Sequence, residues 1–141
     1  MNNIEQTLSI IKPDAVERNL DNEIKNMFKN KGFSIVKEKK IQIEKSEAEK
    51  FYKVHETKPF YNELCSYLSS GPIVVMILQK DNAVLANREL MGATNPKDAE
   101  DGTIRKKFGI SIDKNSVHGS DSLDNARIEI DFFFKNQSKF F

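Results

Sequence analysis

The order of strand-like and helix-like segments predicts an α+β sandwich, in which one antiparallel sheet is covered by helices. Strand, helix, strand, helices, strand and helix follow one another, an order typical of layered sheet-and-helix packing. The chain has 141 residues, so we expect one domain over residues 1–141 with a core of its own. The longest apolar run, Ile73 to Leu78, is too short to cross a bilayer and indicates a buried strand.

The first third of the chain predicts two strands and a helix between them. Apolar and β-branched residues predict a strand over Thr7–Ile11, and Pro13 ends it. Apolar residues at helical spacing predict a helix over Leu20–Lys31 that stops at a glycine. Phe33–Ile43 is then expected to form a strand, bent in its basic middle at Lys37–Lys40.

The middle of the chain predicts two helices and the buried strand. Ser46 and Glu49 have the spacing of a capping box, so a helix should run from there to about His55. A short helix is expected over Phe60–Leu68, and the strand over Ile73–Gln79 follows it.

The last third predicts two helices that flank a long polar segment. Asp81 is expected to cap a helix that stops at Gly92, and Ser122 to cap the last helix. Between them, residues 93–121 should form a long loop, interrupted by a short helix near Ile104–Phe108. Ordered loops of this length are commonly functional.

Composition limits the function classes. Twenty-two basic and twenty-one acidic residues give a formal charge of +1, so the overall charge supports neither nucleic-acid nor membrane binding. The single cysteine, Cys65, excludes an internal disulfide and is compatible with a reducing compartment. The first residues lack the pattern of a signal peptide. We therefore expect a cytoplasmic protein without a membrane-bound part.

The segment Asn115–Ser122 surrounds His118 with small, polar residues. An imidazole can act as a nucleophile or a base near neutral pH, because its ordinary pKa is about 6.5. Gly119 would allow a sharp turn or the close approach of an anion. The alternative is a polar turn that contains a histidine without chemical function.

Attack of His118 on a phosphoryl group would need an acceptor on its other ring nitrogen and fixed cations for the phosphates. Ser120 could bridge towards Glu129 on the last helix. The candidate phosphate ligands lie at the ends of elements or in the long loop: Lys12, Arg88, Thr94 and Arg105. Plainer roles are also open: a solvated charge for either arginine, a surface carboxylate for Glu129 and the end of a strand for Lys12. Tyr52, Phe60 and His55 by themselves fit core or supporting roles.

Several site types are absent from the sequence. It contains no P-loop and no protein-kinase signature, and its two histidines and one cysteine argue against a structural zinc site. A divalent ion would therefore arrive with the phosphates of the substrate, as hydrated Mg²⁺ does.

Several motifs in the same order resemble the nucleoside diphosphate kinase family from Thr7 to about Phe134. Residues 115–121, Asn-Ser-Val-His-Gly-Ser-Asp, are similar to the active-site signature of that family. The other matching segments are Ile11–Val16, Pro59–Phe60, Ser70–Pro72, Met91–Pro96 and Gly102–Arg105. The chain departs from the family pattern at Asn22 and Asp101, where glycine and proline are frequent.

The resemblance implies a ping-pong enzyme in which a nucleoside triphosphate phosphorylates His118 and a nucleoside diphosphate then accepts the phosphoryl group. Ribo- and deoxynucleotides, ATP and GTP among them, would be substrates. By the same resemblance, each matching residue has an expected role: Arg88, Arg105 and Thr94 on the phosphates, Lys12 and Asn115 on the sugar hydroxyls, Phe60 and Ile112 on either side of the base, Tyr52 beside the histidine, and Glu129 and Ser120 orienting its ring.

The resemblance also implies a ferredoxin-like fold, Mg²⁺ carried mainly by the nucleotide, and a homo-oligomer. Asp121 would contact the ion through water. The oligomer would be a tetramer or a hexamer built from dimers, and the short tail, residues 135–141, is like that of bacterial members. Two other hypotheses remain: a regulatory nucleotide- or nucleic-acid-binding protein without turnover, and a phosphocarrier whose acceptor is a protein.

Overall fold

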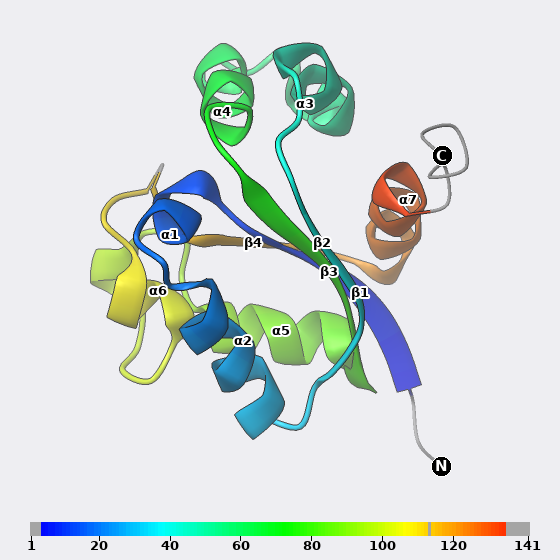
Figure 1. The fold of residues 1–141 in the computed structure, drawn as a ribbon, viewed down its shortest axis with the longest axis vertical. Helices are drawn as coiled ribbons and strands as arrows, with labels where there is room; N and C mark the ends of the chain where they lie inside the picture. Colours follow the sequence, from blue (N-terminus) through cyan, green and yellow to red (C-terminus); the bar gives the residue numbers. More distant parts are fainter. Residues whose placement is uncertain (1–3, 113, 135–141) are drawn as a thin grey trace.

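The computed structural model describes residues 4–112 and 114–134, and the predicted tail lies outside them (Figure 1). Within these residues, four strands form one antiparallel sheet in the order β2-β3-β1-β4. The elements, with η for 3-10 helices, are β1 (Ile4–Ile11), α1 (Pro13–Glu17), α2 (Asp21–Asn30), β2 (Ser34–Ile41), α3 (Lys45–Phe51), η1 (Lys53–His55), α4 (Tyr61–Leu68), β3 (Ile73–Asp81), α5 (Ala83–Met91), η2 (Pro96–Asp98), α6 (Ile104–Phe108), β4 (Val117–Gly119) and α7 (Leu123–Phe133). The predicted α+β class and ferredoxin-like arrangement are confirmed.

Helices cover both faces of the sheet, and β3 explains how. Its apolar run alternates between two cores: Val74, Met76 and Leu78 pack with α2 and α5, whereas Ile73, Val75 and Ile77 pack with α3, α4 and α7. A strand covered on both faces needs apolar residues at every position, which is why this run is continuous. Figure 1 shows α3 and α4 at the top of the view and α2 and α5 below the sheet.

Strand β4 is the main correction to the sequence analysis. Residues 93–121 were expected to form a loop with one short helix, but Val117–Gly119 pairs with β1, with His118 opposite Ile10. Ser116, Val117 and Ser120 are fully buried. Their small side chains fit beneath the helices, so the segment around the histidine belongs to the sheet and the core rather than to a surface loop.

The other differences between the predicted and the observed structure are small and lie at the starts of helices. The capping box forms two residues earlier than predicted, between Glu44 and Glu47, so α3 begins at Lys45. Asn82, not Asp81, precedes α5, with a left-handed backbone. Pro13 ends β1 as predicted but also begins the short helix α1, where its fixed φ suits the first helical position.

Two predicted helix boundaries are confirmed, the end of α5 and the start of α7. Gly92 ends α5 with a positive φ of 83°, and the Ser122 hydroxyl accepts a hydrogen bond from the Asn125 N–H at 3.1 Å at the start of α7. The predicted bend in β2 corresponds to a register shift between Ile35 and Lys37, slightly before the basic residues. The helix that carries Glu129 therefore has a fixed start directly after β4.

Candidate active site

His118 points away from α5 and towards α7. Val117, its neighbour on β4, packs into the core beneath α5, and successive side chains of a strand point to opposite faces. The His118 Nε2 atom lies 2.9 Å from Glu129 Oε1, and the Ser120 hydroxyl donates to the same oxygen at 3.0 Å. Ser120 Oγ in turn accepts the Leu8 N–H from β1 at 3.3 Å. The sheet therefore positions the hydroxyl, the carboxylate and the ring together.

This geometry prepares the imidazole for nucleophilic attack. A carboxylate next to Nε2 favours a proton on that nitrogen, which leaves the lone pair of Nδ1 free. The side chains of His118 and Glu129 are 21% and 16% exposed, so the pair is shielded but still reachable. The predicted interaction of His118, Ser120 and Glu129 is thus present as one connected group.

Glu129→Gln tests the importance of this carboxylate charge. The amide keeps the size of the side chain but holds the ring less firmly in the productive tautomer. We expect phosphorylation of His118 to slow by about 10- to 100-fold, the range found for groups that orient metal-bound histidines. Rapid-quench measurement of phosphoenzyme formation checks this. An unchanged rate would contradict an orienting role for Glu129.

Two aromatic side chains from the end of α3 border the histidine. The ring centroids of Phe51 and Tyr52 lie 5.4 and 6.2 Å from that of His118, both nearly perpendicular to it. Burial, together with the charge of Glu129, raises the pKa of Tyr52, so its phenol stays protonated. Tyr52 was predicted here and Phe51 was not. Its only signal in the sequence was its position next to Tyr52.

A cleft of about 560 Å³ opens beside the nucleophile's strand. Its lining includes Gly119, Arg88 from α5 and Arg105 from α6, as well as Thr94 and Asp121. The cleft therefore brings together the predicted phosphate ligands, apart from Lys12, at the residue that follows His118.

The two arginines differ in their surroundings. Arg105 is buried, and its Nη1 and Nη2 donate to the carbonyls of Gly92 at 3.1 Å and Val117 at 2.8 Å. Burial and the neighbouring charge of Arg88 lower the pKa of Arg105 to about 10, so it remains a cation at neutral pH. Arg88 is exposed, with one long hydrogen bond of 3.4 Å to the Asp121 carbonyl. Arg105 therefore also fastens β4 to the end of α5, which the sequence did not reveal.

Lys12 and Asn115 form a buried pair. The Lys12 ammonium donates to Asn115 Oδ1 at 2.9 Å, and the Asn115 amide donates to the Thr94 carbonyl at 3.1 Å. Three segments far apart in the sequence thus meet at the end of β1. The predicted sugar-binding residues lie together, and they touch the backbone of a predicted phosphate ligand.

Phe60 and Ile112 stand apart from this group. Both are about half exposed, at 45% and 55%. The Phe60 ring lies 6.0 Å from His55, whose ring lies 6.2 Å from Tyr52 beside the nucleophile. Lys58 lies over the Phe60 ring at 5.7 Å. Ile112 lies on the loop after α6, and among the described residues no ring contact or hydrogen bond joins its side chain to the others.

Comparisons with known proteins identify the family of this chain. The family model described as nucleoside diphosphate kinase matches residues 5–139. The chain belongs to this family. It is 58% identical over 131 residues to the nucleoside diphosphate kinase of Campylobacter fetus subsp. fetus and 56% identical to that of Geotalea uraniireducens, covering 93% of this chain and 96% of each relative.

Solved structures of nucleoside diphosphate kinases have the same fold. The enzyme of Aquifex aeolicus superposes with a TM-score of 0.92 at 38% identity, over 94% of this chain and 96% of that one. The enzyme of Encephalitozoon cuniculi gives a TM-score of 0.90 at 35% identity, over 94% and 90%. The predicted family, fold and enzyme class are therefore confirmed.

Among residues 4–112 and 114–134, no three His, Cys, Asp or Glu side chains gather in a way that could hold a metal ion. The described helices also include none with the length and apolar character needed to span a membrane.

Gly119 is required by close packing next to the histidine. A Cβ atom on this residue would lie 2.4 Å from Asn87 Nδ2 and 2.6 Å from Met91 Cε, both on α5. We expect Gly119→Ala to push β4 away from α5 and to lower the free energy of unfolding by about 1–3 kcal/mol. Urea unfolding measures this change. Gly71→Ala is the matched control, since its Cβ would lie 3.6 Å from Pro13 in ordinary contact, and equal losses in both variants would contradict the prediction.

Proposed function

We propose that this protein transfers the γ-phosphoryl group of a nucleoside triphosphate to a nucleoside diphosphate through a phosphohistidine at His118. In the first step, Nδ1 attacks the γ-phosphorus, its bond to the bridging oxygen breaks, and the nucleoside diphosphate leaves. In the second step, a β-phosphate oxygen of another nucleoside diphosphate attacks the same phosphorus and frees the imidazole. The 2.9 Å contact between His118 Nε2 and Glu129 is the observation that carries this proposal.

The surrounding residues would bind and orient the nucleotide. Arg88, Arg105 and Thr94 would hold the phosphates, and the location of these three residues in the cleft beside Gly119 supports that role. Preorganised cations are well suited to this reaction, because phosphoryl transfer depends mainly on positioning and charge stabilisation. Tyr52 would form a wall beside the reacting ring, while Ser120 and Glu129 orient it.

The remaining contacts would determine which nucleotides bind. Lys12 and Asn115 would bind the sugar hydroxyls, and Phe60 and Ile112 would lie on either side of the base. Both side chains are about half exposed and are therefore accessible to a ligand. Stacking alone distinguishes bases poorly because every base has a π-face, so broad acceptance of ribo- and deoxynucleotides follows, ATP and GTP included.

We propose Mg²⁺ as the cofactor, carried mainly by the nucleotide phosphates. The donor set fits such an arrangement: Asp121 is an exposed carboxylate in the lining of the cleft and could contact a hydrated ion through water. When bound, the ion would neutralise charge on the phosphates.

We further propose a homo-oligomer built from dimers, as a tetramer or a hexamer, in the cytoplasm. The order of the described strands leaves one side of β2 unpaired at the edge of the sheet, and Val36 on it is exposed. Exposed strand edges are common sites of association. Light scattering of the purified protein would measure the mass of the assembly, and a monomer would contradict this part of the proposal.

Incubation with γ-labelled ATP and Mg²⁺ tests the activity. We expect an acid-labile, alkali-stable phosphate on His118, located by mass spectrometry, that is discharged by added nucleoside diphosphates. A folded protein that binds nucleotide without labelling would instead be a regulatory binder. A label that only a protein acceptor removes would identify a phosphocarrier. Either of these results would overturn the proposal.

A further inference from the structure

Ser116, two residues before the nucleophile, has a left-handed backbone with a φ of 75°. Residues with a side chain rarely adopt this conformation, and it persists only where the surrounding structure holds it in place. Ser116 is also fully buried. It lies between Asn115, which pairs with Lys12, and the strand that carries His118. A change in this turn would therefore shift the sugar-binding pair relative to the nucleophile.

The backbone of the turn is held by the end of β1. The Lys12 N–H donates to the Ser116 carbonyl at 2.8 Å, while the Lys12 ammonium donates to the Asn115 side chain at 2.9 Å. Lys12 thus contacts both residues of the turn. These two bonds hold the backbone of the turn. The side chain of Ser116 has hydrogen-bond partners of its own, and these also hold the residue in its strained conformation.

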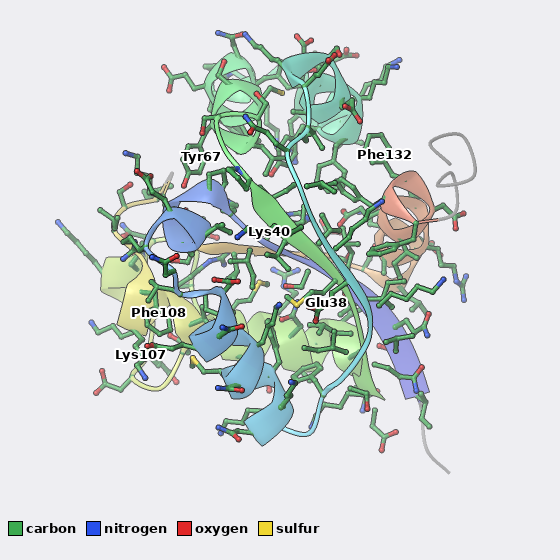
Figure 2. The ribbon with its side chains drawn as sticks, viewed as in Figure 1. Glu38, Lys40, Tyr67, Lys107, Phe108 and Phe132 are labelled. Atoms are coloured by element: carbon green, nitrogen blue, oxygen red, sulfur yellow. The ribbon has the colours of Figure 1, made fainter. Side chains whose placement is uncertain are left out.

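The side chain of Ser116 contacts a buried carboxylate on α1. Its hydroxyl donates to Asp14 Oδ2 at 3.3 Å, and Arg18 Nη2 donates to the same oxygen at 3.2 Å. Tyr67, from α4, donates its hydroxyl to Asp14 Oδ1 and accepts the Asp14 N–H at 2.9 Å. We call these four residues, Asp14, Arg18, Tyr67 and Ser116, the Asp14 cluster. Figure 2 shows Tyr67 below α4, on the side of α1.

The cluster has the charge and burial of a rigid support. The Asp14 side chain is only 3% exposed, and the guanidinium of Arg18 offsets its charge. Burial and the hydrogen bond to Asp14 raise the pKa of Tyr67, so its hydroxyl remains a donor. Arg18 Nη2 also donates to the Phe108 carbonyl at 2.7 Å, at the end of α6. The cluster therefore connects α1, α4 and α6 to the turn before β4.

We propose that Asp14 is a positioning residue: through Ser116 it fixes the turn that sets the Lys12–Asn115 pair relative to His118. The carboxylate accepts from three donors at once, which orients the Ser116 hydroxyl and with it the left-handed backbone. Asp14 would not touch the nucleotide. This inference rests on the proposed function, because it assigns the Lys12–Asn115 pair to the sugar hydroxyls.

The test compares Asp14→Asn with the wild-type protein on two acceptors, a ribonucleoside diphosphate and its 2′,3′-dideoxy analogue. An amide has only one acceptor oxygen, so it cannot serve all three donors. We expect kcat/KM for the ribonucleotide to fall about 10-fold, the effect of losing about one hydrogen bond to a charged group, and the preference over the dideoxy analogue to shrink. A merely structural role would lower both values equally and leave their ratio unchanged.

Two variants of Ser116 extend the test. Ser116→Ala removes the hydroxyl and Ser116→Gly also removes the backbone strain, and both should reduce the preference for the ribonucleotide as Asp14→Asn does. If Asp14→Asn does not fold, these variants decide the question. Ser111→Ala is the matched control: this serine lies on the same loop, is exposed, and its hydroxyl accepts only the local Lys114 N–H at 3.1 Å among the described contacts. It should keep the wild-type ratio.

The outcomes separate the two proposals. A wild-type protein that forms no phosphohistidine overturns the proposed function, whatever the variants do. A wild-type protein that transfers phosphoryl groups without preferring the ribonucleotide overturns the sugar-binding role and the inference with it. A wild-type preference that persists unchanged in folded Asp14→Asn or in both Ser116 variants overturns the inference alone.

Discussion

Replacing His118 with alanine is expected to abolish the phosphoenzyme and to reduce phosphoryl exchange by at least about 10⁴-fold, because the covalent route loses its nucleophile. Other side chains of the cleft would still bind the nucleotide, since Arg88, Arg105 and Thr94 are unchanged. Labelling with γ-labelled ATP measures the first effect, and a coupled exchange assay measures the second. Binding of nucleotide, followed by calorimetry, should persist.

The same variant should remain folded. His118 lies on β4 but is partly exposed, and its ring makes edge contacts to Phe51 and Tyr52, each worth up to about 1.5 kcal/mol. Glu129 keeps the hydrogen bond from Ser120. His55→Asn is the control, since it removes the other histidine, and it should still become phosphorylated. A labelled His118→Ala protein would show that another residue is the acceptor.

The sequence predicted most of the fold where local patterns determine it. The apolar run of β3, the stop at Gly92 and the cap at Ser122 all depend on neighbouring residues, and all three are confirmed. Strand β4 was missed because it is three residues long and forms through pairing with β1, more than a hundred positions earlier. A local sequence pattern cannot identify a partner strand that is so distant in the chain.

In the candidate site, too, contacts between residues distant in the sequence could not be predicted from local patterns. Spacing placed Glu129 on a helix, but its contact with His118 depends on how α7 packs against the sheet. The roles of Lys12 and Asn115 came from the resemblance to a family, because no pattern links two residues 103 positions apart. The buried hydrogen bonds of Arg105 and the contact of Phe51 with the histidine depend on tertiary packing, so neither could be read from composition or spacing. The roles of these residues towards a nucleotide remain predictions.

Arg105→Ala should combine a catalytic defect with a loss of stability. We expect kcat/KM to fall by about 10²–10³-fold, as when a preorganised donor is removed from a developing charge. The variant also leaves the carbonyls of Gly92 and Val117 without their guanidinium donor, which should lower the free energy of unfolding by about 2 kcal/mol. Urea unfolding and steady-state kinetics measure the two effects separately. Arg105→Lys cannot restore both hydrogen bonds, since a lysine lacks the planar fork.

Arg88→Ala provides the contrast that separates the two roles of Arg105. Arg88 is exposed and, within the described part of the chain, makes a single long hydrogen bond, so its removal should change stability by less than about 0.5 kcal/mol while still weakening catalysis. Both variants should lose activity to a similar extent with purine and pyrimidine nucleotides, because a phosphate ligand does not contact the base. An altered preference among bases in Arg105→Ala would contradict its assignment to the phosphates. Equal losses of stability in both variants would show that the guanidinium of Arg105 does not fasten β4 to the end of α5.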